Sequence, residues 1–176
     1  ISYTMSKFFE DMGYRAVPIT ASNIWRYREY KDLKATFAPD MSHIYASVAA
    51  GLTELGFSGL AMSPEFGPRN RFVSIITDAP LVPDPLLPGG TLCDNCGQCK
   101  KHCATEAFTK EVQGEVAIEI EGHKYSRCDK NLWRCAWSEH FGLDCELDIP
   151  EKVDEPVILD KIKELGMRGG TMGCCL

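Results

Sequence analysis

The sequence Cys93-Asp94-Asn95-Cys96-Gly97-Gln98-Cys99-Lys100-Lys101-His102-Cys103 places four cysteines in one short run. Its spacing, C-x2-C-x2-C-x3-C, is that of the bacterial ferredoxin run, which binds a cubane iron–sulfur cluster. The two-residue gaps let the first three sulfurs converge on three irons of one cluster, whereas the fourth cysteine points away and usually reaches a second cluster. We therefore expect this stretch to bind iron and sulfide, and the protein to handle electrons.

A structural zinc site and a disulfide framework are the competing interpretations of this run. Zinc needs four thiolates, usually as two separated C-x2-C pairs, so a tight triplet plus one fits it poorly. Disulfides fit less well still, because cysteines three residues apart on one turn have no separate partners. The spacing therefore favours an iron–sulfur cluster over both alternatives.

The composition is that of a soluble globular protein, with 44% apolar and 25% charged residues. No apolar run is long enough to span a bilayer. A net charge of −6 and a pI near 5.2 argue against a nucleic-acid partner. The nine cysteines are odd in number and clustered, which suits metal thiolates in a reducing or anoxic compartment. We expect that compartment to be the cytoplasm.

The two ends of the chain predict a fragment of a longer protein. The sequence begins at Ile1 with neither an initiator methionine nor a signal-like segment, and it ends at Leu176 without a polar tail. Its 176 residues suffice for one domain, or for a core with a small cluster-binding appendage.

Apolar periodicity predicts the elements of the first half. Apolar residues at positions 1, 5, 8, 9 and 12 have helical spacing, and Gly13 is a natural stop. Ser42 can cap a second helix, which we expect to continue through Leu55 to a stop at Gly56. Strands are expected at 14–20, 59–63 and 71–78, with an irregular segment at 22–41 and a turn at 64–69. The apolar run 73–76 suits an interior strand.

The domain boundary is expected in the proline-rich stretch 79–90, which can enter neither a sheet centre nor a helix interior. We divide the chain there into residues 1–84 and 85–176. The second part should contain the cysteine run, a hairpin strand at 115–120, a helix at about 129–141 and a last amphipathic helix that ends at Gly166.

Five further cysteines could supply more ligands. These are Cys128, Cys135, Cys145, Cys174 and Cys175. Cys128 and Cys135 are seven residues apart on one predicted helix, which would place them on the same face. The alternative for each is a small buried hydrophobe. The adjacent pair at 174 and 175 can rarely both face one cluster. One cluster is expected, and the count leaves a second open.

Three stretches of this chain resemble the C-terminal half of the corrinoid reductive dehalogenases and, more distantly, epoxyqueuosine reductase. They are Ala49–Gly56, Leu60–Arg71 and Thr77–Asp84, in that order before the cysteine run, and the likeness covers roughly residues 5–150. The resemblance implies an α+β fold, in which a partial nitroreductase-like α/β core that holds cobalamin is followed by a ferredoxin-like module with two [4Fe-4S] clusters.

The resemblance also implies a ligand set. Cys93, Cys96 and Cys99 would bind one cluster with a distal cysteine, and Cys103 would bind the other. The sequence departs from the family at Ala104, where proline is common. In the second motif Cys128, Cys145 and Pro150 are retained, whereas Gly142 and Ile149 stand where cysteines are expected. Cys135 or one of the pair at 174 and 175 could substitute.

Catalytic candidates come only from the resemblance. Dehalogenases have a tyrosine acid on the N-terminal side and a basic partner near the Gly-Pro-Arg-x-Arg turn, for which Tyr14, Arg69 and Arg71 are the nearest residues. The two arginines could instead pair with Glu65 or Asp78 at the surface. Thr36 stands where epoxyqueuosine reductases carry an acidic proton donor.

Two functions remain in view. In the first, the chain is the cluster-bearing half of a cobalamin-dependent oxidoreductase, which takes electrons from a low-potential donor protein and reduces a small-molecule substrate. In the second, it is a non-catalytic electron-transfer protein or subunit that has lost the corrinoid.

Overall fold

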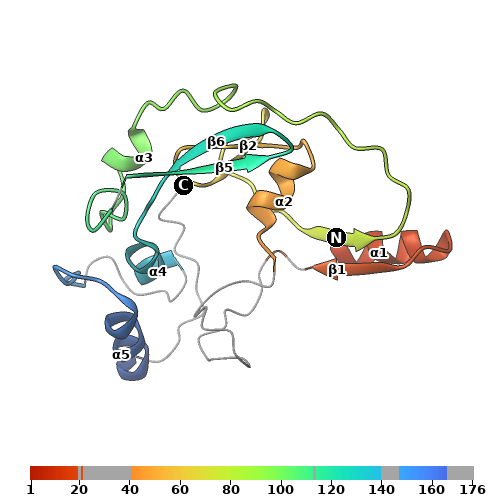
Figure 1. The fold of residues 1–176 in the computed structure, drawn as a ribbon. Coiled ribbons are helices and arrows are strands. Elements are labelled where there is room, and N and C mark those ends of the chain that lie inside the picture. The colour runs from red at the N-terminus through yellow and green to blue at the C-terminus, as the bar shows by residue number, and fades with distance from the viewer. Residues whose placement is uncertain (20, 22–40, 113, 140–146, 166–176) are drawn as a thin grey trace.

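The computed structural model describes residues 1–19, 21, 41–112, 114–139 and 147–165 (Figure 1). Its elements are α1 (Ser2–Asp11), β1 (Ala16–Ile19), α2 (His43–Ala49), β2 (Glu54–Leu55), β3 (Ala61–Met62), β4 (Ser74–Thr77), α3 (Gln98–Lys101), β5 (Glu115–Ile120), β6 (His123–Cys128), α4 (Leu132–Glu139) and α5 (Glu155–Leu165). Within these residues the strands form antiparallel pairs, β1 with β4, β2 with β3 and β5 with β6.

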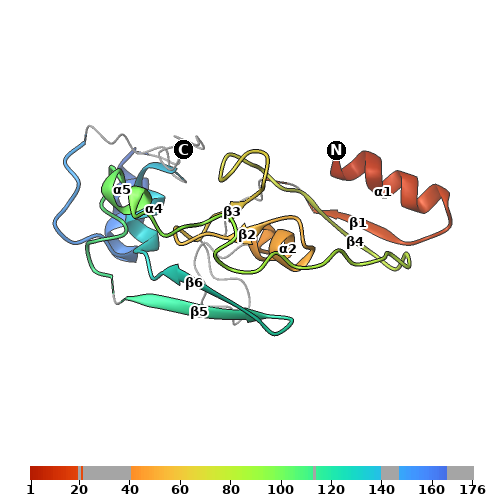
Figure 2. The same ribbon diagram turned by 90° about the horizontal axis from the view of Figure 1, so that it is seen from above.

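The elements lie along an extended body. Figures 1 and 2 show α1 and the β1–β4 sheet at one end, and α3, α4 and α5 at the other. The proline-rich stretch 79–90 connects the two ends as an arch without helix or strand. The described structure is a mixture of helices and small sheets, while the α+β class and the nitroreductase-like and ferredoxin-like assignments stay predictions.

The first helix forms where its apolar spacing predicted it, with Gly13 just beyond its end at φ +91°. The side of this helix that is buried is not its apolar side. The side chains of Ser2 and Ser6 are buried, whereas Ile1, Phe8 and other apolar residues of this segment are exposed. The predicted interior strand is also wrong, because β4 pairs with β1 alone among the described residues and leaves Ile76 56% exposed.

The second helix begins as predicted, since the Ser42 side chain accepts a hydrogen bond from the backbone N–H of Tyr45 at 3.4 Å. The prediction that it continues to Leu55 is wrong: it ends at Ala49, and Leu55 belongs to β2. Gly51 explains the early stop. Its φ is +73°, and a Cβ there would lie 2.6 Å from the carbonyl oxygen of Pro85. The proline-rich segment therefore packs against the end of α2, and only glycine leaves room for it.

Two groups of buried side chains form the core. Val48, Leu55 and Tyr125 pack together, so α2 and β2 share this group with the β5–β6 hairpin. The second group, Ala136, Trp137, Val153 and Ile158, joins α4 to α5. The strand predicted at 115–120 and the last amphipathic helix are both confirmed, as β5 and α5. The division at residues 84 and 85 stays a prediction, and the first group packs across it.

Ile158→Ala should lower the free energy of unfolding by about 2 to 5 kcal/mol, because the side chain is fully buried between α4 and α5. Urea denaturation measures this change. Leu132→Ala is the control, since Leu132 is 63% exposed on α4 and its truncation should cost less than about 0.5 kcal/mol. Equal effects of the two substitutions would contradict this account of the core.

Candidate functional site

The cysteine run folds into a tight bend that continues into α3. Cys93 and Cys96 precede the helix and Cys99 lies within it. The bend contains two residues with left-handed backbone, Asn95 at φ 56° and Gly97 at φ 73°. The backbone N–H of Cys96 donates to Asp94 Oδ1 at 3.1 Å, which stabilises the bend. Local turn chemistry thus brings the first three cysteines back toward one another.

The Cys99 thiol lies within range of the charge on Cys93 and on Cys96. Burial is the main factor that raises the pKa of Cys99, and charge on Cys93 and Cys96 adds to the increase. Among the described residues, no three His, Cys, Asp or Glu side chains gather closely enough to hold one metal ion. A single zinc bound at 2.3 Å would need its sulfurs about 4 Å apart. A cubane places each thiolate on a different iron.

Backbone N–H groups donate hydrogen bonds to two sulfurs of the cysteine run, those of Cys93 and Cys103. The Phe57 N–H donates to Cys93 Sγ at 3.3 Å, from the turn between β2 and β3. Cys103 follows α3, and its Sγ accepts the N–H of Ala107 at 3.3 Å. Hydrogen bonds of this kind stabilise thiolates and set cluster potentials. The donor set and its surroundings therefore fit an iron–sulfur cluster.

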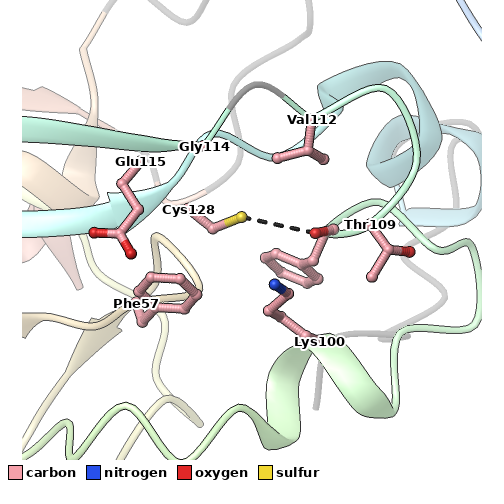
Figure 3. Close-up of a pocket in the computed structure, with 8 residues that line it drawn as sticks. Phe57, Lys100, Thr109, Val112, Gly114, Glu115 and Cys128 are labelled. Carbon is pink, nitrogen blue, oxygen red and sulfur yellow. Dashed lines mark hydrogen bonds between the residues drawn. The ribbon is translucent and has the colours of Figure 1, made fainter.

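Cys128 lines a cavity of about 330 Å³ together with Lys100 and Glu115. Figure 3 shows the side chains of Lys100 and Cys128 directed toward the same space between α3 and the β5–β6 hairpin. Burial raises the pKa of the Cys128 thiol, and the nearby charge of Lys100 opposes this increase. The Cys128 backbone N–H donates to the carbonyl of Phe57 at 2.8 Å. The same residue of the β2–β3 turn therefore contacts both Cys93 and Cys128.

The placement of Cys128 and Cys135 on one helix is wrong. Cys128 is the last residue of β6, whereas Cys135 lies on α4 and is 6% exposed. The helix begins only at Leu132 because Asn131 caps it: its Oδ1 accepts the N–H groups of Trp133 and Arg134 at 2.9 and 3.1 Å. The remaining candidates Cys145, Cys174 and Cys175 lie outside the described residues, as do Thr36 and Gly142.

The three catalytic candidates are not brought to this site. Tyr14 is half-buried in the turn after α1, and Arg69 and Arg71 are exposed near the β3–β4 connection. None of them lines the cavity beside Cys128, and their catalytic assignment stays a prediction. Asp78, one of the two suggested partners for the arginines, pairs with Arg15 at 2.8 Å, and hydrogen bonds from Arg15 lower the pKa of Asp78.

Arg134 is a structural residue that the sequence analysis missed. It is 1% exposed and donates to the carbonyls of Thr105 at 3.4 Å, Pro150 at 3.3 Å and Glu151. Its Nε lies 3.5 Å from the carboxylate of Glu111. The segment after Cys103 is thus tied to the segment before α5. The signal was an arginine among the apolar residues of a predicted helix.

No family model matches this chain. It is 33% identical over 122 residues to the tetrachloroethene reductive dehalogenase of Sulfurospirillum multivorans, a match that covers 66% of this chain and 24% of that protein. The corresponding protein of Dehalobacter restrictus is 29% identical over 118 residues, or 66% of this chain and 18% of its own length. The epoxyqueuosine reductase of Listeria monocytogenes is 32% identical over 135 residues, or 65% and 35%.

These matches place the chain among oxidoreductase-related proteins. More closely, it is a distant homologue of the reductive dehalogenases and epoxyqueuosine reductases, as the motifs predicted. It spans between 18% and 35% of the length of these three relatives. Among the described residues no helix is long and apolar enough to cross a membrane.

Arg134→Met should lower the free energy of unfolding by about 2 to 4 kcal/mol, because it leaves buried carbonyls and the Glu111 carboxylate without their donor. Urea denaturation measures the change. Lys152→Met is the control: this exposed lysine pairs with Asp154 at 3.2 Å, and its loss should cost about 0 to 1 kcal/mol. An Arg134→Met protein as stable as the control would contradict the role assigned to Arg134.

Proposed function

We propose that this chain transfers electrons through a [4Fe-4S] cluster within an oxidoreductase of the reductive dehalogenase and epoxyqueuosine reductase kind. The observation that carries the proposal is the tight bend of the cysteine run, with left-handed backbone at Asn95 and Gly97, in which Cys93 and Cys96 precede α3 and Cys99 lies within it. Their C-x2-C-x2-C spacing and the Phe57 N–H directed at Cys93 support the same assignment. The named relatives supply the class of protein.

The residues around the run would have distinct roles. A bound cubane supplies a low-potential one-electron carrier, whose potential depends on hydrogen bonds, net charge and burial. Cys93, Cys96 and Cys99 would hold three of its irons, and Phe57 would donate to the Cys93 sulfur. The fourth ligand would come from the remaining cysteines, because Gly142 and Ile149 stand where the resemblance expects two further cysteines.

A second cluster would need ligands from the cysteines outside the triplet Cys93, Cys96 and Cys99. Cys103, Cys128 and Cys135 are the candidates among the described residues, and Cys128 faces a cavity that Lys100 also lines. An ammonium group there would offset the negative charge of a thiolate-bound cluster. Cys145, Cys174 and Cys175 complete the set of available thiols.

Reduction of a small molecule, with electrons from a low-potential donor protein, is the activity we propose for the whole protein. The printed names of the relatives refer to tetrachloroethene and epoxyqueuosine, and we extend only the class of reaction to this chain. A corrinoid acceptor follows from the resemblance. Tyr14, Arg69 and Arg71 do not line the cavity beside Cys128.

The alternative is a non-catalytic electron-transfer protein or subunit that has lost the corrinoid. Gly142 and Ile149 in place of two motif cysteines, and Thr36 in place of an acidic donor, favour it. Cobalt content separates the two functions, because both need iron but only the first needs a corrinoid.

Protein purified without oxygen should contain iron and acid-labile sulfide in equal amounts, with a broad absorption shoulder near roughly 400 nm. Cys96→Ser should remove most of this iron and sulfide, because the exposed Cys96 thiol is one of the three converging ligands. Gln98→Ala is the control: it changes an exposed α3 side chain between two of the cysteines and should retain the wild-type iron content. Stoichiometric zinc in place of iron would overturn the proposal.

Protein isolated anoxically from the cells that make it should also contain cobalt and show corrinoid absorption bands. Elemental analysis and the visible spectrum measure both. Iron without cobalt in such preparations would contradict the corrinoid-dependent function and select the electron-transfer alternative.

A further inference from the structure

A buried carboxylate holds the segment that leads into the cysteine run. Glu54 is 1% exposed in β2. Its Oε1 accepts the backbone N–H of Gly90 at 2.6 Å, and its Oε2 accepts the N–H groups of Leu92 and, at 3.3 Å, of Cys93. Three of four consecutive residues thus donate to one side chain. Such charge-assisted bonds are about twice as strong as neutral ones.

The strand β2 and the turn that follows it contact both the backbone and the sulfur of Cys93. Glu54 binds the Cys93 N–H, and Phe57, three residues later, donates its N–H to Cys93 Sγ at 3.3 Å. The cysteine is therefore fixed at two points by β2 and the turn that follows it. Neighbouring Thr53 is fully buried and shares a hydrogen bond of 2.9 Å with Ser47 on α2, which anchors β2 in turn.

The negative charge of Glu54 affects the titration of Tyr125, another buried residue. After burial, the second cause that raises the pKa of Tyr125 is the negative charge of Glu54. All three hydrogen-bond donors described for Glu54 are neutral backbone groups, so they orient the carboxylate without cancelling its charge. A charge that is buried in this way is weakly screened by solvent and salt.

We infer that Glu54 is a positioning residue for the cluster ligand Cys93 and that its buried negative charge lowers the reduction potential of the cluster. The inference rests on the proposed function. A negative charge near a cluster disfavours the added electron, and net charge and hydrogen bonding are established determinants of cluster potential. The Leu92 and Cys93 N–H groups donate to Glu54, so they do not donate to the sulfurs of a bound cluster. The loss of these donors would also lower the reduction potential.

The test is a redox titration of anoxically purified protein, followed by electron paramagnetic resonance. Glu54→Gln keeps the shape of the side chain and removes its charge. We expect its midpoint potential to rise by about 59 mV or more, which is a tenfold change in the equilibrium constant of a one-electron couple. Glu119→Gln removes the same charge from an exposed position on β5 and should leave the potential unchanged. Equal potentials in the two variants would overturn the inference.

A second variant keeps the test decisive if Glu54→Gln takes up no cluster. Glu54→Asp retains the charge but shortens the side chain by one methylene group, so its cluster should have the wild-type potential and be lost faster to an iron chelator. A shifted potential in this variant, or no cluster at all, would overturn the charge effect.

The two proposals fail in different ways. Wild-type protein without iron and sulfide would remove the proposed function and this inference together. Wild-type protein with a cluster whose potential is indifferent to Glu54→Gln would remove the inference alone.

Discussion

The backbone of Phe57 joins two of the cysteine-bearing segments of the described structure, the cysteine run and the end of β6. Its N–H reaches Cys93 Sγ at 3.3 Å, and its carbonyl accepts the N–H of Cys128 at 2.8 Å. One turn between two very short strands therefore relates the cysteine run to the end of the β5–β6 hairpin. Burial of Leu55 against Val48 and Tyr125 fixes that turn in the core. The arrangement of thiols thus depends on packing in the part of the chain that precedes them.

Features set by neighbouring residues were predictable from the sequence. The Ser42 cap, the stop at Gly13 and the period-2 strand β5 each follow from local chemistry. The end of α2 was not predictable, because it depends on the contact between Gly51 and Pro85 far along the chain. Asn131 was a local signal that a helix begins between Cys128 and Cys135, because its side chain caps α4. The seven-residue spacing of the two cysteines suggested one continuous helix instead.

The candidate site also combines features that follow from neighbouring residues with features that depend on distant parts of the chain. The bend that gathers Cys93, Cys96 and Cys99 follows from spacing and turn residues within the run. Glu54 and Arg134 could not be identified this way, because their partners are 36 to 39 and 16 to 29 residues distant. The periodicity of α1 likewise predicts a helix without predicting which side is covered, and the buried side carries Ser2 and Ser6.

The exposure of Cys96 sets the chemical vulnerability of this protein. Among the described thiols, Cys96 is the exposed one, whereas Cys128 and Cys135 are 2% and 6% exposed. Peroxide and dioxygen meet that sulfur first, and oxidation beyond the sulfenic acid is irreversible without dedicated repair. Oxidative damage in air would therefore begin at the bend before α3.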